Sequence, residues 1–163
     1  MPVPSNHASS ALDFSLLSFL IIDDQPFSRR MVRSMLVGFG SREVYESANG
    51  IEAFELARNV MPNVIITDLV MPIFNGLRFI KTVKDVQSPT HMIPIIVLSG
   101  YLTKAAAVMV KESGAEELLV KPVSPKVLYD HIMHLVLRDD PANPLAFVRH
   151  RKPRKKPGDM TYV

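Results

Sequence analysis

The chain contains no cysteine, which excludes disulfides and metal sites built on thiolates. It also lacks a long apolar run, because the stretches at residues 19–22 and 93–98 are strand-sized. Both fall far below the ~20 residues that a membrane-spanning helix needs. Residues 1–13 have neither the charged start nor the apolar core of a signal peptide. These absences predict a cytoplasmic protein without a membrane span.

Basic charge is concentrated at the C-terminal end of the 163 residues. Residues 141–163 carry six basic side chains and one acidic side chain, a net charge of +5, whereas residues 1–140 have a net charge of −2. The overall charge of +3 therefore reflects a tail rather than the folded part. We predict a flexible leader at residues 1–14, one domain at residues 15–138 and a basic tail at residues 139–163.

Short apolar segments alternate with helix-length amphipathic segments five times along this domain. The strand-like segments are residues 16–22, 44–47, 64–68, 93–98 and 117–120. The alternation predicts an α/β fold, a doubly wound five-stranded parallel sheet with five helices on its two faces. Pro26 suits the first turn of the first helix, whose expected buried stripe is Phe27, Met31 and Met35.

Polar side chains stand at the ends of four of these five strands. Asp23 and Asp24 follow the first strand, Asp68 ends the third, Ser99 follows the fourth and Lys121 follows the fifth. Right-handed crossovers place the carboxyl ends of parallel strands at one edge of the sheet, so we expect these side chains to converge there.

Three neighbouring carboxylates repel one another unless a cation lies between them. Mg²⁺ fits best, with Mn²⁺ as the alternative, because it binds a few carboxylates and leaves positions for water and a phosphate oxygen. The ammonium of Lys121 suits a phosphoryl oxygen, and the hydroxyl of Ser99 can donate a hydrogen bond to the same group.

This set of motifs resembles the receiver domain of two-component response regulators in bacterial signalling, and in particular the chemotaxis-type receivers. The resemblance rests on Asp23-Asp24, on Asp68 followed by Met71-Pro72 and Gly76, on Ser99, and on Lys121-Pro122. It covers roughly residues 15–138 and includes the spacing of all four motifs. It implies a flavodoxin-like fold with strand order 2-1-3-4-5.

The resemblance also implies a role for each matching position. Asp68 would accept a phosphoryl group from a phosphohistidine on a sensor histidine kinase or a histidine phosphotransfer protein. Asp24 would bind Mg²⁺ directly, Asp23 mainly through water, and the backbone carbonyl of Val70 would be a further ligand. Lys121 would pair with Asp68 at rest and with the phosphoryl group afterwards, through a cis peptide bond to the following proline.

Signal output is expected to begin at Ser99, which would move toward the phosphoryl group. The family usually has an aromatic residue three positions before its lysine, where this chain has Leu118. The resemblance therefore does not extend to aromatic coupling of Ser99 to the face formed by the fourth helix, the fifth strand and the fifth helix. Tyr101 and Val70 are expected to flank the access route of water or a phosphatase and so to affect phosphoryl lifetime.

We therefore expect a single-domain response regulator that catalyses only its own phosphorylation and dephosphorylation. It would bind a downstream protein or pass the phosphoryl group along a relay, as a monomer or a weak phosphorylation-dependent dimer. One alternative is a regulator that binds nucleic acid through the basic residues 149–156, although the tail is also explained as a solvated segment. Another is an aspartate-based phosphohydrolase, but such enzymes place an acid where this chain has Val70.

Overall fold

The computed structural model describes residues 12–71 and 75–138. Most of the predicted leader, the Pro72 of the predicted motif and the predicted basic tail lie outside the described residues. Among the described helices, none combines the length and the apolar character that crossing a membrane requires.

The strands form one five-stranded parallel sheet in the order β2-β1-β3-β4-β5, which confirms the predicted fold and strand order. The strands are β1 (Ser18–Ile22), β2 (Glu43–Ser47), β3 (Val64–Asp68), β4 (Ile95–Ser99) and β5 (Glu117–Val120). The five helices that alternate with them are α1 (Pro26–Gly38), α2 (Gly50–Val60), α3 (Gly76–Lys84), α4 (Lys104–Ser113) and α5 (Pro125–Leu137).

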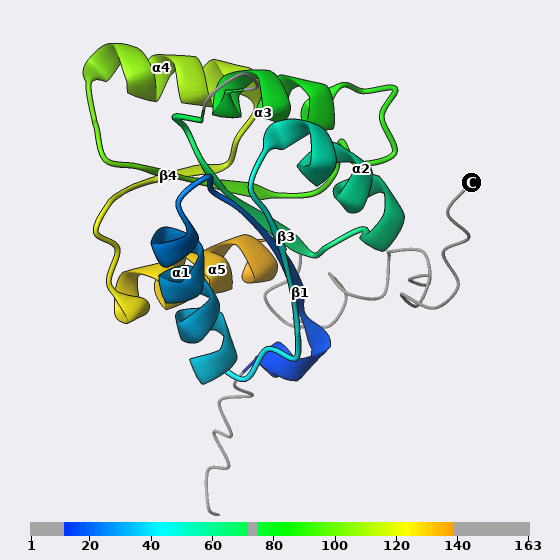
Figure 1. The fold of residues 1–163 in the computed structure, drawn as a ribbon, viewed down its shortest axis with the longest axis vertical. Helices are drawn as coiled ribbons and strands as arrows, with labels where there is room; N and C mark the ends of the chain where they lie inside the picture. Colours follow the sequence, from blue (N-terminus) through cyan, green and yellow to red (C-terminus); the bar gives the residue numbers. More distant parts are fainter. Residues whose placement is uncertain (1–11, 72–74, 139–163) are drawn as a thin grey trace, which may run out of the picture.

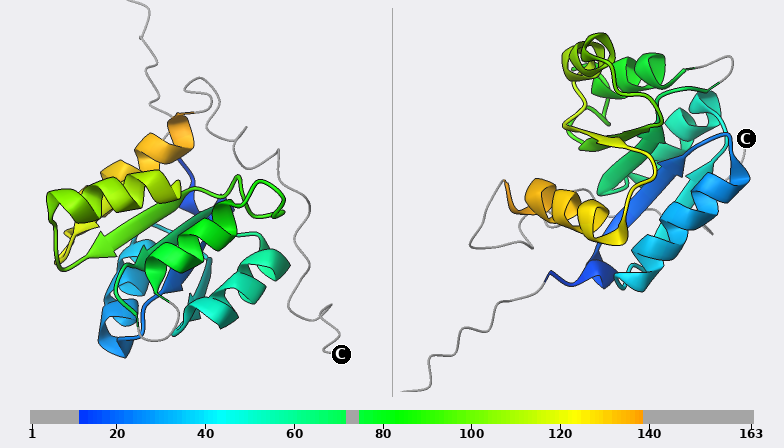
Figure 2. Two further views of the ribbon diagram at one scale, coloured as in Figure 1. Left: turned by 90° about the horizontal axis from the view of Figure 1, so that it is seen from above. Right: turned by 90° about the vertical axis from the view of Figure 1, so that its left-hand side faces the viewer.

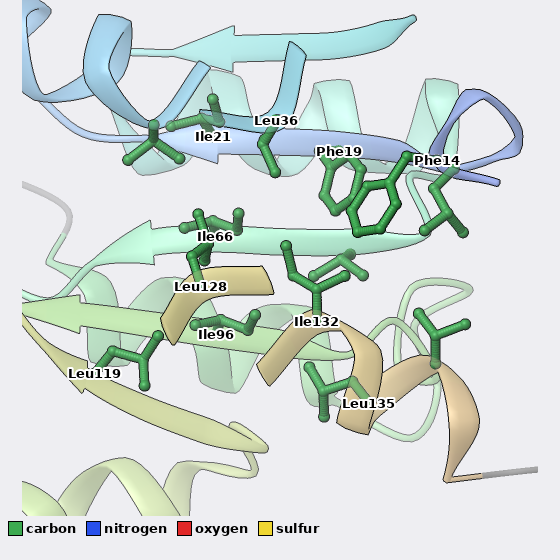
Figure 3. Packing of buried hydrophobic residues seen from close by; sticks show 14 of the residues in the cluster. Phe14, Phe19, Ile21, Leu36, Ile66, Ile96, Leu119, Leu128, Ile132 and Leu135 are labelled. Atoms are coloured by element: carbon green, nitrogen blue, oxygen red, sulfur yellow. The ribbon is translucent and has the colours of Figure 1, made fainter. Parts of the chain in front are cut away.

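The helices cover both faces of the sheet because successive strand side chains point to opposite sides. Ile21 and Ile66 belong to the hydrophobic cluster on the face covered by α1 and α5. Leu20 and Ile65 belong to the cluster on the face covered by α2, α3 and α4. This division is visible in Figure 1 and in the two turned views of Figure 2. Figure 3 shows the first cluster, with Ile132 of α5 lying over the sheet.

Side-chain caps fix the starts of four helices. Asn49, Asn75, Thr103 and Ser124 each accept a hydrogen bond from the backbone N–H three residues later, which satisfies a donor that the helix itself cannot. The first helix begins instead at Pro26. The proline ring fixes φ near its helical value, and an N–H at this first position would have no partner within the helix. Each helix therefore starts at a residue set by the local sequence.

The buried stripe predicted for α1 is wrong. Val32 and Leu36 face the core, whereas Phe27 is 67% exposed and Met31 is 42% exposed. Met35, the last residue of the predicted stripe, only packs against the edge of the cluster. A spacing of four residues occurs in both sets, so periodicity alone did not decide which of them faces the sheet.

The packed domain also begins earlier than predicted. Residues 14–16 form a short 3₁₀ helix, η1 (Phe14–Leu16), so the first strand starts at Ser18 rather than at residue 16. The Phe14 side chain is 2% exposed, and its ring stacks on Tyr129 of α5 and meets Phe39 edge-on. Leu12 and Phe14, assigned to the leader from sequence, are therefore part of the hydrophobic cluster covered by α1 and α5, whereas Asp13 between them is exposed.

Candidate functional site

Three carboxylates meet at the carboxyl edge of the sheet, as the sequence predicted. Asp68 ends β3, and Asp23 and Asp24 directly follow β1, the strand that pairs with β3. Each of the three offers an oxygen within 4.8 Å of the others. Neighbouring parallel strands that end together bring these side chains side by side.

The chain itself engages both carboxylate oxygens of Asp23. The backbone N–H of Gln25 donates to Oδ1 at 2.9 Å, and the ammonium of Lys121 donates to Oδ2 at 2.8 Å. The guanidinium of Arg29 donates to the backbone carbonyl of Asp23 at 2.7 Å, which fixes the main chain as well. With only 5% of its side chain exposed, Asp23 is a rigid part of the site.

The side chain of Asp68 is largely buried, although the residue stands at the end of a strand. Its side chain is 11% exposed, and the backbone N–H of Val70 donates to Oδ1 over 3.4 Å. Burial raises the pKa of Asp68, because a low-polarity surrounding disfavours the charged form, while the positive charge of Lys121 opposes this shift. The negative charge of Asp23 raises the pKa further. The carboxylate of Asp68 is therefore poorly solvated and lies beside one cation.

The ammonium of Lys121 reaches into this group from the end of β5. The backbone N–H of Lys121 donates to the carbonyl of Ser99 at 2.8 Å, and the predicted cis peptide bond between Lys121 and Pro122 is present. The Nζ atom lies 2.8 Å from Asp23 Oδ2 and 3.5 Å from Asp68 Oδ2. The predicted ion pair with Asp68 is thus present, but Lys121 lies closer to Asp23.

The hydroxyl of Ser99 is held by the loop that follows β4. It donates to the carbonyl of Tyr101 at 2.7 Å and accepts from the N–H of Tyr101 at 3.1 Å. Ser99 is only 1% exposed, so it is buried beside the site. Its hydroxyl, however, is hydrogen-bonded to the loop. Leu118 is partly buried against the second cluster, whereas Tyr101 and Val70 are 79% and 71% exposed on the loops beside the site.

Sequence reasoning missed two residues of the site, Ser28 and Arg29. Both stand in the first turn of α1, which starts directly after Asp23 and Asp24. The Ser28 hydroxyl accepts a hydrogen bond from Lys121 Nζ at 3.2 Å. Their position close behind the acidic pair was the available signal, but the helical pattern suggested only a surface role.

Comparison with known proteins agrees with this geometry. The family model described as the response regulator receiver domain matches residues 19–133. The chemotaxis protein CheY1 of Helicobacter pylori is 34% identical over 117 residues, which are 71% of this chain and 94% of that protein. The response regulator DivK of Brucella anthropi is 30% identical over 107 residues, which are 66% of this chain and 85% of that protein.

Solved structures show the same likeness. The structure of the chemotaxis protein CheY4 of Vibrio cholerae superposes with a TM-score of 0.68 at 33% identity and covers 72% of this chain and 97% of that one. The likeness extends to the fold, a parallel sheet with strand order β2-β1-β3-β4-β5. The chain belongs to the response regulator receiver domain family and is similar to its chemotaxis receivers.

Proposed function

We propose that Asp68 accepts a phosphoryl group from a phosphohistidine in a Mg²⁺-dependent reaction. Membership of the family makes the chain a phosphorylation-dependent signalling regulator. The finer assignment rests on one observation: the buried carboxylate of Asp68 lies 3.5 Å from the ammonium of Lys121 and within 4.8 Å of oxygens from two other carboxylates. This arrangement offers a nucleophile, a cation and ligands for a metal in one place.

The chemical step would be a direct displacement at phosphorus. A carboxylate oxygen of Asp68 attacks the phosphorus atom and forms a new P–O bond, while the P–N bond to the donor histidine breaks. The imidazole nitrogen leaves with the electron pair of that bond. Phosphoryl transfer depends mostly on positioning and on neutralising the phosphoryl oxygens, and Lys121 lies close enough to do both.

The residues of the acidic group fit Mg²⁺, with Mn²⁺ as the alternative, because all their donors are oxygen atoms. Asp24 and Asp68 would be direct ligands and the carbonyl of Val70 a further one. Asp23 would contribute mainly through water, since Gln25 and Lys121 already occupy its oxygens. A bound ion would supply positive charge to the phosphoryl oxygens; the protein's own part is to hold these oxygens together at the strand ends.

The expected donors are a sensor histidine kinase or a histidine phosphotransfer protein, and the expected readout is binding of a downstream protein. We propose no turnover of free phosphoesters, because the position two residues after Asp68 holds Val70, which cannot act as an acid. The cytoplasmic location and the monomeric or weakly dimeric state remain predictions of the sequence.

Intact mass spectrometry tests this proposal. The protein is incubated with acetyl phosphate in the presence of Mg²⁺ or of EDTA. We expect a mass gain of one phosphoryl group with Mg²⁺, little gain with EDTA, and none in Asp68→Asn. Asp130→Asn, which alters an exposed carboxylate on α5, is the matched control and should be modified like the wild type. Equal phosphorylation of Asp68→Asn and wild type would contradict the assignment.

A further inference from the structure

Among residues 12–71 and 75–138, three polar side chains lie close to the ammonium of Lys121. They are Asp23 Oδ2 at 2.8 Å, Ser28 Oγ at 3.2 Å and Asp68 Oδ2 at 3.5 Å. The ammonium donates hydrogen bonds to Asp23 and Ser28, and its contact with Asp68 is an ion pair. Two of the partners are carboxylates of the acidic group, and the third is a neutral hydroxyl on α1.

From this geometry we propose that Ser28 is a positioning residue, which holds the ammonium of Lys121 in place for the phosphoryl group on Asp68. The inference rests on the proposed phosphoryl transfer to Asp68 and adds a residue to its machinery. Ser28 touches neither the acceptor nor the donor in this account, and it acts through the lysine alone.

The place of Ser28 is set by the start of α1. Pro26 is the first residue of this helix, so Ser28 lies in its first turn, close behind the acidic pair that follows β1. Helix and strand end are tied together by Arg29, which donates to the carbonyl of Asp23 at 2.7 Å. The hydroxyl is therefore presented from a fixed backbone rather than from a mobile loop.

The surroundings of Lys121 explain why such an anchor matters. Beside Ser28 and Lys121 lies a cavity of about 260 Å³, lined mainly by apolar side chains including Phe27, Met31 and Pro122. A lysine has a long flexible stem, and apolar walls offer its charged head no hydrogen-bond partner. On this side of the site the hydroxyl of Ser28 supplies a polar contact that holds the head over the carboxylates.

A neutral partner also suits a lysine that must change contacts. A third carboxylate would hold the ammonium by charge and compete with an arriving phosphoryl group, whereas a hydroxyl competes only by a hydrogen bond. Ser28 can thus keep Lys121 close to Asp68 before transfer and still allow the short movement to the phosphoryl oxygens. Groups held in place before the reaction stabilise developing charge without further reorganisation.

The first arm of the test measures Lys121 directly and does not depend on phosphorylation. The protein is reductively methylated with formaldehyde and a mild borohydride, and modification of Lys121 is followed by peptide mass spectrometry. The exposed Lys126 is the internal reference, with 84% of its side chain accessible. In Ser28→Ala we expect Lys121 to react faster by about threefold to tenfold, the range for the loss of one hydrogen bond of ordinary strength.

The second arm measures the rate of phosphoadduct formation with acetyl phosphate and Mg²⁺ over a range of donor concentrations. Ser28→Ala should lower the maximal rate by about threefold to tenfold and leave the half-saturating donor concentration unchanged. Ser28→Thr, which keeps a hydroxyl, should restore both readouts. Ser34→Ala, the same change at an exposed serine of α1, should match the wild type.

The outcomes separate this inference from the proposed function. Unchanged reactivity of Lys121 in Ser28→Ala would overturn the positioning role, and so would higher reactivity without a slower phosphorylation rate. Equal effects of Ser28→Ala and Ser34→Ala would also overturn it. If the wild type is not phosphorylated, the proposed function fails together with the catalytic meaning of Ser28, while the methylation arm still decides whether Ser28 holds Lys121.

Discussion

At the scale of single residues, the environment of Asp68 makes a prediction about stability. Burial raises the pKa of Asp68, so the folded protein binds a proton at this carboxyl more tightly than the unfolded chain does. The stabilisation from this proton is complete below the unfolded-state pKa and is lost as the pH rises through the raised folded-state pKa. At neutral pH the charged Asp68 therefore destabilises the fold.

Asp68→Asn removes this charge. In EDTA at neutral pH we expect its free energy of unfolding to exceed that of the wild type by on the order of 1 kcal/mol, measured by urea denaturation. The difference should shrink in acid, where the wild-type carboxyl is protonated. Asp130→Asn, at an exposed carboxylate, should show no such gain. A variant less stable than wild type at neutral pH would show that the ion pair with Lys121 outweighs the burial of Asp68.

Gly76 is the second residue with a specific role, because it lets α3 start against the end of β3. A Cβ atom there would collide with the carbonyl oxygen of Asp68 and lie 2.8 Å from Leu69 Cα, and both of these are backbone atoms. We expect Gly76→Ala to destabilise the protein by about 2 kcal/mol and to slow phosphorylation by displacing Asp68. Chemical denaturation and the acetyl phosphate assay measure the two effects.

Gly38→Ala is the matched control for this change. A Cβ at Gly38, the last residue of α1, would meet nothing within 4 Å. We expect it to be neutral or to stabilise the protein by a few tenths of a kcal/mol, since alanine favours the helix over glycine. Equal losses in the two variants would mean that the close approach at Gly76 does not matter.

At the scale of elements, the loop after β4 is the part that contacts Ser99, the predicted switch residue. Ser99 holds this loop through two hydrogen bonds to the backbone of Tyr101. If Ser99 turns toward a phosphoryl group, both bonds must break, and the loop and the start of α4 are released. This route differs from coupling through an aromatic residue, because the position three residues before Lys121 holds Leu118, which has no ring.

Ser99→Ala imitates the loss of these bonds without phosphorylation. We expect faster amide hydrogen exchange in the peptide that contains Tyr101, because its N–H loses the acceptor on Ser99. Peptides from α2, on the far side of α3 from this loop, should exchange at the wild-type rate. Exchange at Tyr101 that stays unchanged in Ser99→Ala would contradict control of the loop by this hydroxyl.

The short η1 helix is an element that stabilises the domain rather than its site. Its Phe14 ring lies with centroid distances of 5.3 Å to Tyr129 and 5.4 Å to Phe39, and so joins α5 to the end of α1. We expect Phe14→Ala to lower the free energy of unfolding by about 3 to 4 kcal/mol. Leu16→Ala, in the same turn but at a 42% exposed side chain, should cost less than about 1 kcal/mol.

Chemical denaturation of the two variants measures this difference. A loss in Phe14→Ala as small as that in Leu16→Ala would mean that the domain does not need η1 and begins with β1 at Ser18.

At the scale of the whole molecule, the sequence predicts what depends on periodicity and on strand ends. The alternation of apolar strands and helices predicted the parallel sheet. The family resemblance predicted the order of its strands. Asp23, Asp68 and Lys121 could be grouped because parallel strands deliver their last residues to one edge. Neither inference required knowledge of side-chain contacts.

What the sequence did not predict depends on the rotation of elements and on contacts between distant segments. Phe27 and Val32 both lie on stripes with a spacing of four, and only packing against the sheet decides that Val32 is buried. The burial of Phe14 depends on Tyr129, which is far away along the chain. The bond between Ser28 and Lys121 likewise joins residues 93 positions apart.

The central claim is that the phosphoryl group resides on Asp68, and locating that group tests it most directly. Wild-type protein phosphorylated with acetyl phosphate and Mg²⁺ is reduced with borohydride, which converts an aspartyl phosphate to homoserine, and is then digested and sequenced by mass spectrometry. We expect homoserine at position 68, with the aspartates at positions 23 and 24 intact. Homoserine at either of those positions, or an adduct on a histidine with Asp68 unchanged, would contradict the account.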